Sequence, residues 1–240
     1  MWVPFAIKKP IDLDPGDPLR AGRKALVLHT AVTTASSLYP SWKTGPIEAH
    51  FYVRKDGTLE QYLDTKWTAD HAVDANPWAL GLESQDNGSP TPGPWTEAQL
   101  NTIVKLALYL DIPAQMLKCA PSDGIGYHRQ CDAWNPNKHS CPTDPKVKQI
   151  PTILARMKET EMALDALAKE ISVDPDRLKR ALLELLGLDA RIQGLNRPAN
   201  AVRAKGYDWG AAADNPAATH NHDGTYTKVG HPHLAATTVK

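Results

Sequence analysis

Short apolar runs alternate with turn signals through the first 150 residues of the chain. Residues 25–31 (ALVLHTA) and 79–84 (ALGLES) have the length and apolar character of buried strands. Residues 49–54 and 58–63 flank an Asp-Gly pair at 56–57, and Asp-Gly between two such runs is the strongest short signal for a β-hairpin. The pattern therefore predicts a sheet built partly from a hairpin.

Helical spacing begins after residue 95. Thr96 and Gln99 form a capping box ahead of the run 100–110 (LNTIVKLALYL), whose apolar positions recur at helical spacing. Strands on both sides of such a helix predict an α/β fold with a central mixed β-sheet flanked by helices.

Helices dominate the next part of the chain. One is predicted from about Asp144, and a second begins near Pro151 and runs through 152–171, because proline suits the first helical turn. A third has Asp174 as its N-cap and Gly187 as its stop. Its leucine stripe predicts packing against the second helix or across a dimer.

The last residues change in composition. Residues 197–240 are rich in Ala, Asn, Gly, Thr and His without periodicity, which favours a low-complexity tail or a loosely packed module. We therefore divide the chain into a domain at 1–150, a helical segment at 151–196 and this tail. The tail histidines suggest a metal cluster by composition, but solvated residues are the preferred interpretation of His220, His222, His231 and His233.

Composition excludes some classes of function. Hydrophobic residues make up 42% of the chain and charged residues 22%, which supports a buried core. The 27 Lys and Arg residues balance 27 Asp and Glu residues, whereas a dedicated nucleic-acid binder usually carries a basic excess. No stretch approaches the roughly 20 apolar residues of a membrane span, so we expect no membrane insertion. The start has no signal-peptide pattern either, which predicts synthesis in the cytoplasm.

A set of metal-binding residue types carries the candidate chemistry. His29 ends a predicted strand, and His128, His139 and Cys141 follow about a hundred residues later. Catalytic zinc takes three protein ligands and keeps one position open, and imidazole and thiolate are among its preferred ligands. Amide hydrolysis also needs a base, and Glu83 on the strand 79–84 is the candidate. His139, two residues before Cys141, is expected to face the same cleft.

Five segments in this order resemble a known family. They are LVLHTA (26–31), AHFYVRKDGTLEQYLD (49–64), TADHA (68–72), ALGLESQ (79–85) and GYHRQ–CDAWNPNKHSCP (126–142). Together they resemble the type 2 N-acetylmuramoyl-L-alanine amidases, which include many phage endolysins and are related to peptidoglycan-recognition proteins. The ending, GIGYH followed by W-x-P-x-x-[KH]-x-C-P, is similar to that of actinobacterial phage endolysins. The resemblance covers roughly residues 20–150.

The resemblance implies a role for each matching position. His29, His128 and Cys141 match the three zinc ligands, and Glu83 matches the strand carboxylate that acts as general base. The family often has lysine two residues before the third ligand, where this chain has His139 beside Lys138, so either side chain is a candidate for stabilising the oxyanion.

One further position differs from relatives, and one further segment resembles them. Where some relatives have tyrosine in the hairpin strand, this chain has Ala49. The resemblance therefore implies that Glu83 carries a larger share of the catalysis. The segment that resembles W-H-A contains His71, which we expect to line the substrate groove. His50 in the hairpin strand is expected to be structural.

The cysteines leave alternatives open. An odd count of three favours at least one metal-binding or catalytic thiol. Cys141 is a possible nucleophile activated by a histidine, and Cys119, Cys131, Cys141 and His128 are a possible closed structural zinc site. For Cys119 and Cys131 there are two interpretations. One is a disulfide that forms after release, and the preferred one is two buried free thiols.

The resemblance implies zinc-dependent cleavage of the amide bond between N-acetylmuramic acid and L-alanine in bacterial peptidoglycan, as in a phage endolysin that reaches the wall after release. A recognition module that binds peptidoglycan without cutting it is one alternative. An amidase acting on soluble muropeptides during wall recycling is another. For residues 151–240 wall targeting, packing and dimerisation all remain open.

Overall fold

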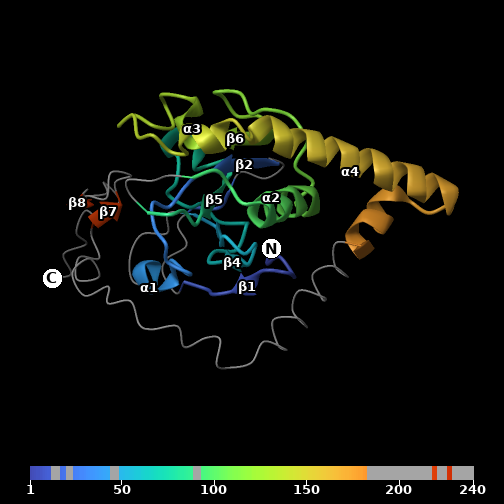
Figure 1. Cartoon of the computed structure of the whole chain (residues 1–240), viewed down its shortest axis with the longest axis horizontal. Coiled ribbons are helices and arrows are strands. Elements are labelled where there is room, and N and C mark those ends of the chain that lie inside the picture. Colours follow the sequence, from blue (N-terminus) through green and yellow to red (C-terminus); the bar gives the residue numbers. More distant parts are fainter. Residues whose placement is uncertain are drawn as a thin grey trace.

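The structure is a computed structural model. It describes residues 1–11, 17–19, 24–43, 49–88, 93–182, 218–220 and 226–228 (Figure 1). Within these residues, the strands of the main sheet are β1 (Ile7–Lys8), β2 (Ala25–Leu28), β3 (Phe51–Val53), β4 (Leu59–Gln61), β5 (Leu80–Ser84) and β6 (Gly124–Tyr127). The helices and 3-10 turns are α1 (Tyr39–Trp42), η1 (Val73–Ala75), α2 (Glu97–Tyr109), η2 (His128–Gln130), α3 (Asp144–Val147) and α4 (Ile150–Glu170).

The main sheet of the described residues has the strand order β1-β4-β3-β5-β2-β6. The hairpin β3–β4 is its antiparallel pair, and the pairs β1–β4, β3–β5, β5–β2 and β2–β6 are parallel. The predicted mixed sheet with flanking helices is confirmed. Because β2, β5 and β6 run in the same direction, their carboxyl ends meet at one edge of the sheet.

The two faces of the sheet are covered differently. Leu26 and Leu28 of β2 pack into a large core with α2 and the first turns of α4, whereas Val27 belongs to a second core with Trp78 and Trp134. This alternation follows from the two-residue period of a strand. His29 and Glu83 continue the odd-numbered series on their strands, so they face away from α2 and α4.

The capping box at α2 is confirmed. Thr96 Oγ1 accepts from the Gln99 backbone N–H at 3.1 Å, and Gln99 Oε1 accepts from the Thr96 N–H at 3.0 Å. This exchange satisfies two of the backbone donors that a helix start otherwise leaves open.

The predicted helix near Pro151 is α4, which has proline in its first turn. Ile150, Ile153 and Met157 bury its first turns in the same core as α2, and the helix then extends beyond α2 (Figure 1). Its later part exposes Met162 and Leu167. A dimer contact here, like the division of the chain near residue 150, stays a prediction.

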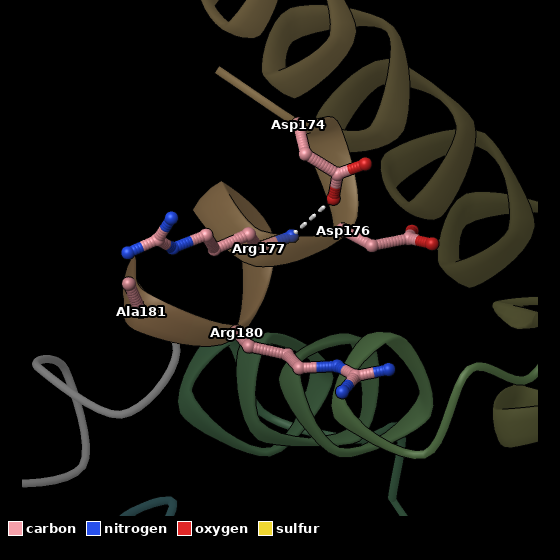
Figure 2. A pocket seen from close by; sticks show the side chains of 5 residues that line it. All are labelled: Asp174, Asp176, Arg177, Arg180 and Ala181. Atoms are coloured by element: carbon pink, nitrogen blue, oxygen red, sulfur yellow. Dashed lines mark hydrogen bonds between the residues drawn. The ribbon is translucent and has the colours of Figure 1, made fainter.

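The N-cap at Asp174 is also confirmed, because its carboxylate accepts from the Arg177 backbone N–H at 2.9 Å (Figure 2). Residues 175–182 are helical, and the expected stop at Gly187 lies outside the described residues. Most of the predicted tail also lies outside them, and its described parts pair as the antiparallel strands β7 (Ala218–His220) and β8 (Tyr226–Lys228). None of the described helices has the length and apolar character needed to cross a membrane.

Candidate metal centre

The three predicted ligands lie together at the carboxyl edge of the sheet. His29 directly follows β2 and His128 directly follows the neighbouring strand β6, so the parallel pairing brings the two rings together. The potential ligand atoms of His29, His128 and Cys141 all lie within 4.8 Å of one another. Among the residues that the structure describes, His29, His128 and Cys141 form the group whose side chains could hold a metal ion.

Backbone contacts hold Cys141 against the two strand ends. The Arg129 N–H donates to the Cys141 carbonyl oxygen at 2.8 Å, and the Thr30 N–H donates to the Cys141 sulfur at 3.3 Å. A residue 112 positions from His29 is thereby fixed beside it, with 3.7 Å between the sulfur and His29 Nδ1.

This geometry fits a zinc ion. With Zn–N near 2.1 Å and Zn–S near 2.3 Å, nitrogen and sulfur ligands at a tetrahedral zinc are roughly 3.6 Å apart. The 3.7 Å between His29 Nδ1 and Cys141 Sγ matches that separation. His128 Nε2 lies 2.9 Å from the Trp134 carbonyl oxygen, which can only accept, so this nitrogen carries the proton and Nδ1 is left as the ligand atom.

Burial argues against Cys141 as a nucleophile. The side chain has no exposed surface. Burial, followed by the Glu83 carboxylate, raises the pKa of the Cys141 thiol well above its usual range. Reactive cysteines are partly exposed and have lowered pKa values, so these surroundings do not favour Cys141 as a nucleophile.

The other two cysteines are bonded to each other. Cys119 and Cys131 form a disulfide with 5.6 Å between their Cα atoms, so the prediction of two buried free thiols is wrong, and Cys119 is exposed. The segment before Cys119 runs along β6, where the Leu117 N–H donates to the Ile125 carbonyl oxygen at 2.9 Å. That pairing brings Cys119 to η2 and also removes both sulfurs from any closed zinc site.

Glu83 stands beside the cluster on β5. Its side chain is 10% exposed, and Oε1 lies 3.9 Å from His29 Nδ1. The parallel pairing of β5 with β2 places it next to His29, since Leu28 is opposite Leu82. A carboxylate so close to the ligand atoms is within reach of a water molecule at the same centre.

His139 and Lys138 differ in their surroundings. His139 is half-buried, whereas Lys138 is exposed. The pKa of His128 is lowered to about 4, chiefly by burial and further by the nearby His139. The buried Asn135 side chain fixes the loop by donating to the His139 carbonyl oxygen at 2.7 Å and accepting from its N–H at 2.9 Å.

His71 and His50 are both buried on the same face of the sheet. His71 Nδ1 lies 3.1 Å from His29 Nε2, and His71 Nε2 lies 3.0 Å from the Ala79 carbonyl oxygen. His50 bridges the Trp67 carbonyl oxygen and the Gly81 N–H, as expected of a structural residue. A groove role for His71 stays a prediction.

A buried ion pair under the site has no clear sequence signal. Lys146 of α3 and Asp86 after β5 are 2.8 Å apart and almost completely buried. Both side chains contact the hydroxyl group of Thr30. The backbone N–H of Thr30 also donates to the Cys141 sulfur. Burial lowers the pKa of Lys146 and Asp86 opposes this shift. The pair therefore supports the backbone that carries His29 and meets Cys141.

Replacing Lys146 with Met is expected to destabilise the fold by roughly 3–5 kcal/mol, because it leaves the Asp86 carboxylate buried without its cation. Urea unfolding of the metal-free protein measures this loss. Changing Asp86 to Asn in the same chain removes the second charge, so the double variant should recover part of the stability. A Lys146→Met protein as stable as the parent contradicts this role.

The pocket in Figure 2 lies elsewhere. It is formed at the start of the helical residues 175–182, and none of the predicted site residues lines it. Its lining residues are Asp174, Asp176, Arg177, Arg180 and Ala181.

Fold and cluster together define a mixed α/β protein with a candidate His–His–Cys metal centre at the edge of its sheet. The sequence of residues 20–144, just over half of the chain, matches the family model Amidase_2, described as N-acetylmuramoyl-L-alanine amidase. The chain belongs to this family, as the resemblance predicts.

Comparison with solved structures finds similar chains at low identity. The N-acetylmuramoyl-L-alanine amidase LysC from Clostridium intestinale URNW is 21% identical, covers 62% of this chain and 97% of its own, and has a TM-score of 0.44. The Ph2119 endolysin from the Thermus scotoductus MAT2119 bacteriophage Ph2119 is 16% identical over 58% and 90%, with a TM-score of 0.42. PGRP-SA of Apis mellifera is 15% identical over 61% and 94%, with a TM-score of 0.44. A search of curated protein sequences finds no match. The family assignment therefore rests on the sequence match.

Proposed function

We propose that this protein is a zinc-dependent hydrolase of the amide bond between N-acetylmuramic acid and L-alanine in bacterial peptidoglycan. The observation that carries the proposal is the cluster of His29, His128 and Cys141 with Glu83 beside it, in a chain of the amidase family. Two imidazoles and one thiolate form a three-ligand set that leaves a position open for chemistry.

The residues divide the work between them. Zinc in such a site acts as a Lewis acid that polarises a carbonyl group and makes a water molecule more acidic. The Glu83 carboxylate accepts the proton of the attacking water and returns it to the nitrogen of the leaving alanine. His139, held in its loop by Asn135, stabilises the negative charge that develops on the carbonyl oxygen.

The biological setting is part of the proposal. The ending GIGYH with W-x-P-x-x-[KH]-x-C-P supports a phage endolysin, made in the cytoplasm and acting on the wall after release. Wall targeting or dimerisation by residues 151–240 is part of the same proposal. Because Ile153 and Met157 of α4 lie in the main core, the test compares wall binding of the full chain with that of a chain ending at residue 182, which keeps α4.

Product analysis tests the reaction. The full chain is incubated with purified sacculi, and the soluble products are assayed for new amino-terminal alanine and for new reducing sugar ends. The proposal expects alanine amino termini without reducing ends. Wall binding with neither product identifies a recognition module instead, and cleavage restricted to soluble muropeptides identifies a recycling amidase.

A further inference from the structure

The His71 ring lies between a metal ligand and a backbone carbonyl group. One ring nitrogen, Nδ1, is 3.1 Å from His29 Nε2, and the other, Nε2, is 3.0 Å from the Ala79 carbonyl oxygen. The rings of His71 and His29 meet edge to face, with centroids 5.2 Å apart and planes at 84°. Both contacts are inside the protein, because His71 is 7% exposed.

These contacts fix where the protons are. The Ala79 carbonyl oxygen can only accept, so His71 Nε2 carries a proton. The His71 ring is 7% exposed, and burial of this depth disfavours the charged form of an imidazole, so the ring carries one proton, on Nε2, and accepts at Nδ1. His29 Nε2 must then be the donor. The lone pair of His29 is thereby left on Nδ1, the atom 3.7 Å from the Cys141 sulfur.

The fold also holds the His71 ring in place. The Asn76 side-chain oxygen accepts from the backbone N–H groups of His71 and Ala72 at 2.9 and 2.7 Å. Gly81 on β5 leaves the space that the ring occupies, because a Cβ atom there would lie 2.6 Å from the His71 Cγ. The ring is therefore confined on one side by the sheet and bonded at both nitrogens.

We propose that His71 is a positioning residue that sets the tautomer and orientation of His29, so that Nδ1 faces the metal. The inference rests on the proposed zinc function and assigns His71 a role behind the ligand, in place of the substrate-groove role that the resemblance predicts. Partners of this kind typically change metal affinity by roughly 10–100-fold when they are lost.

A pair of variants with matched shapes isolates the hydrogen bond. Leucine and asparagine have similar shapes, but asparagine keeps an oxygen where His71 Nδ1 accepts, and leucine does not. We expect the full-length His71→Leu protein to bind zinc about 10–100-fold more weakly than the parent. His71→Asn should stay close to the parent, which is rescue by the conservative variant. Competition with a chromogenic chelator measures the affinities without using activity.

His50 provides the control. It is as deeply buried as His71 and bonded at both ring nitrogens, but its partners are Trp67 and Gly81 and not a metal ligand. His50→Leu should lower thermal stability while leaving zinc affinity within a few-fold of the parent. An equal loss of affinity in the leucine variants of His50 and His71 identifies a general effect of destabilisation and overturns the inference.

A measurement on the unaltered protein covers the case in which a variant does not fold. Long-range proton–nitrogen NMR spectra distinguish the tautomers of histidine rings, and they should show His29 and His71 both protonated at Nε2. A His29 ring protonated at Nδ1 in the metal-free protein overturns the inference, as does unchanged zinc affinity in a folded His71→Leu protein. If the unaltered protein binds zinc tightly but releases no alanine, only the proposed function is contradicted. The positioning role of His71 is then still tested by the zinc affinities of the variants.

Discussion

Replacing Glu83 with Gln is expected to abolish amide hydrolysis while leaving zinc bound. The two side chains have nearly the same shape, but the amide of glutamine does not accept the proton of the attacking water. General-base catalysis contributes about 10²–10⁴-fold to a rate, so turnover should fall by at least about 100-fold. Release of amino-terminal alanine measures the rate, and elemental analysis measures the zinc content of the same sample.

Glu60 is the matched control for this substitution. It is a buried glutamate on β4, and its partners are Lys9, Ser37, Arg54 and Tyr62 rather than residues of the cluster. Glu60→Gln should lower stability but leave the folded protein active. Full activity of the Glu83→Gln protein contradicts the assignment of Glu83 as the general base. Loss of zinc from that variant reassigns Glu83 to holding the centre together.

Replacing Cys141 with Ala is expected to remove zinc as well as activity. Cys141 supplies one of the three proposed ligands. Losing a residue that only hydrogen-bonds to a ligand typically weakens metal binding by about 10–100-fold, and losing a ligand itself should weaken it more. We therefore expect zinc affinity to fall by more than about 100-fold, measured by chelator competition, with amidase activity lost in parallel. Tight zinc binding with one ion per chain in Cys141→Ala contradicts the His–His–Cys centre.

The disulfide gives the control for Cys141. Serine at both Cys119 and Cys131 removes the bond, which closes a short loop and is worth about 3 kcal/mol of stability. Neither sulfur belongs to the cluster, so this double variant should keep one zinc per chain. Its loss of zinc would falsify the separation of the disulfide from the metal centre.

Part of the candidate site was predictable because His29 and Glu83 lie at the ends of apolar strands. The run 25–31 has a clear buried-strand pattern that ends near His29, and parallel strands bring their carboxyl ends together. Residues 79–84 carry Glu83 to the same edge for the same reason. The order of segments in the resemblance supplies His128 and Cys141, since the loop that contains Cys141 has no periodic pattern of its own.

Other features depend on tertiary contacts that no local pattern encodes. The strand β1 has two residues and β6 contains two glycines, so neither gives a usable period. The disulfide depends on the pairing of the segment before Cys119 with β6. Lysine is rarely buried, so the position of Lys146 beneath the centre is visible only once α3 is packed against Asp86.

Zinc titration of the metal-free full chain, with release of amino-terminal alanine from sacculi as the readout, tests the central claim most directly. We expect no release before zinc is added, a rate that rises in proportion to zinc, and a plateau at one ion per chain. Release that continues undiminished after chelation, or no release at any zinc concentration, contradicts the assignment of this protein as a zinc amidase.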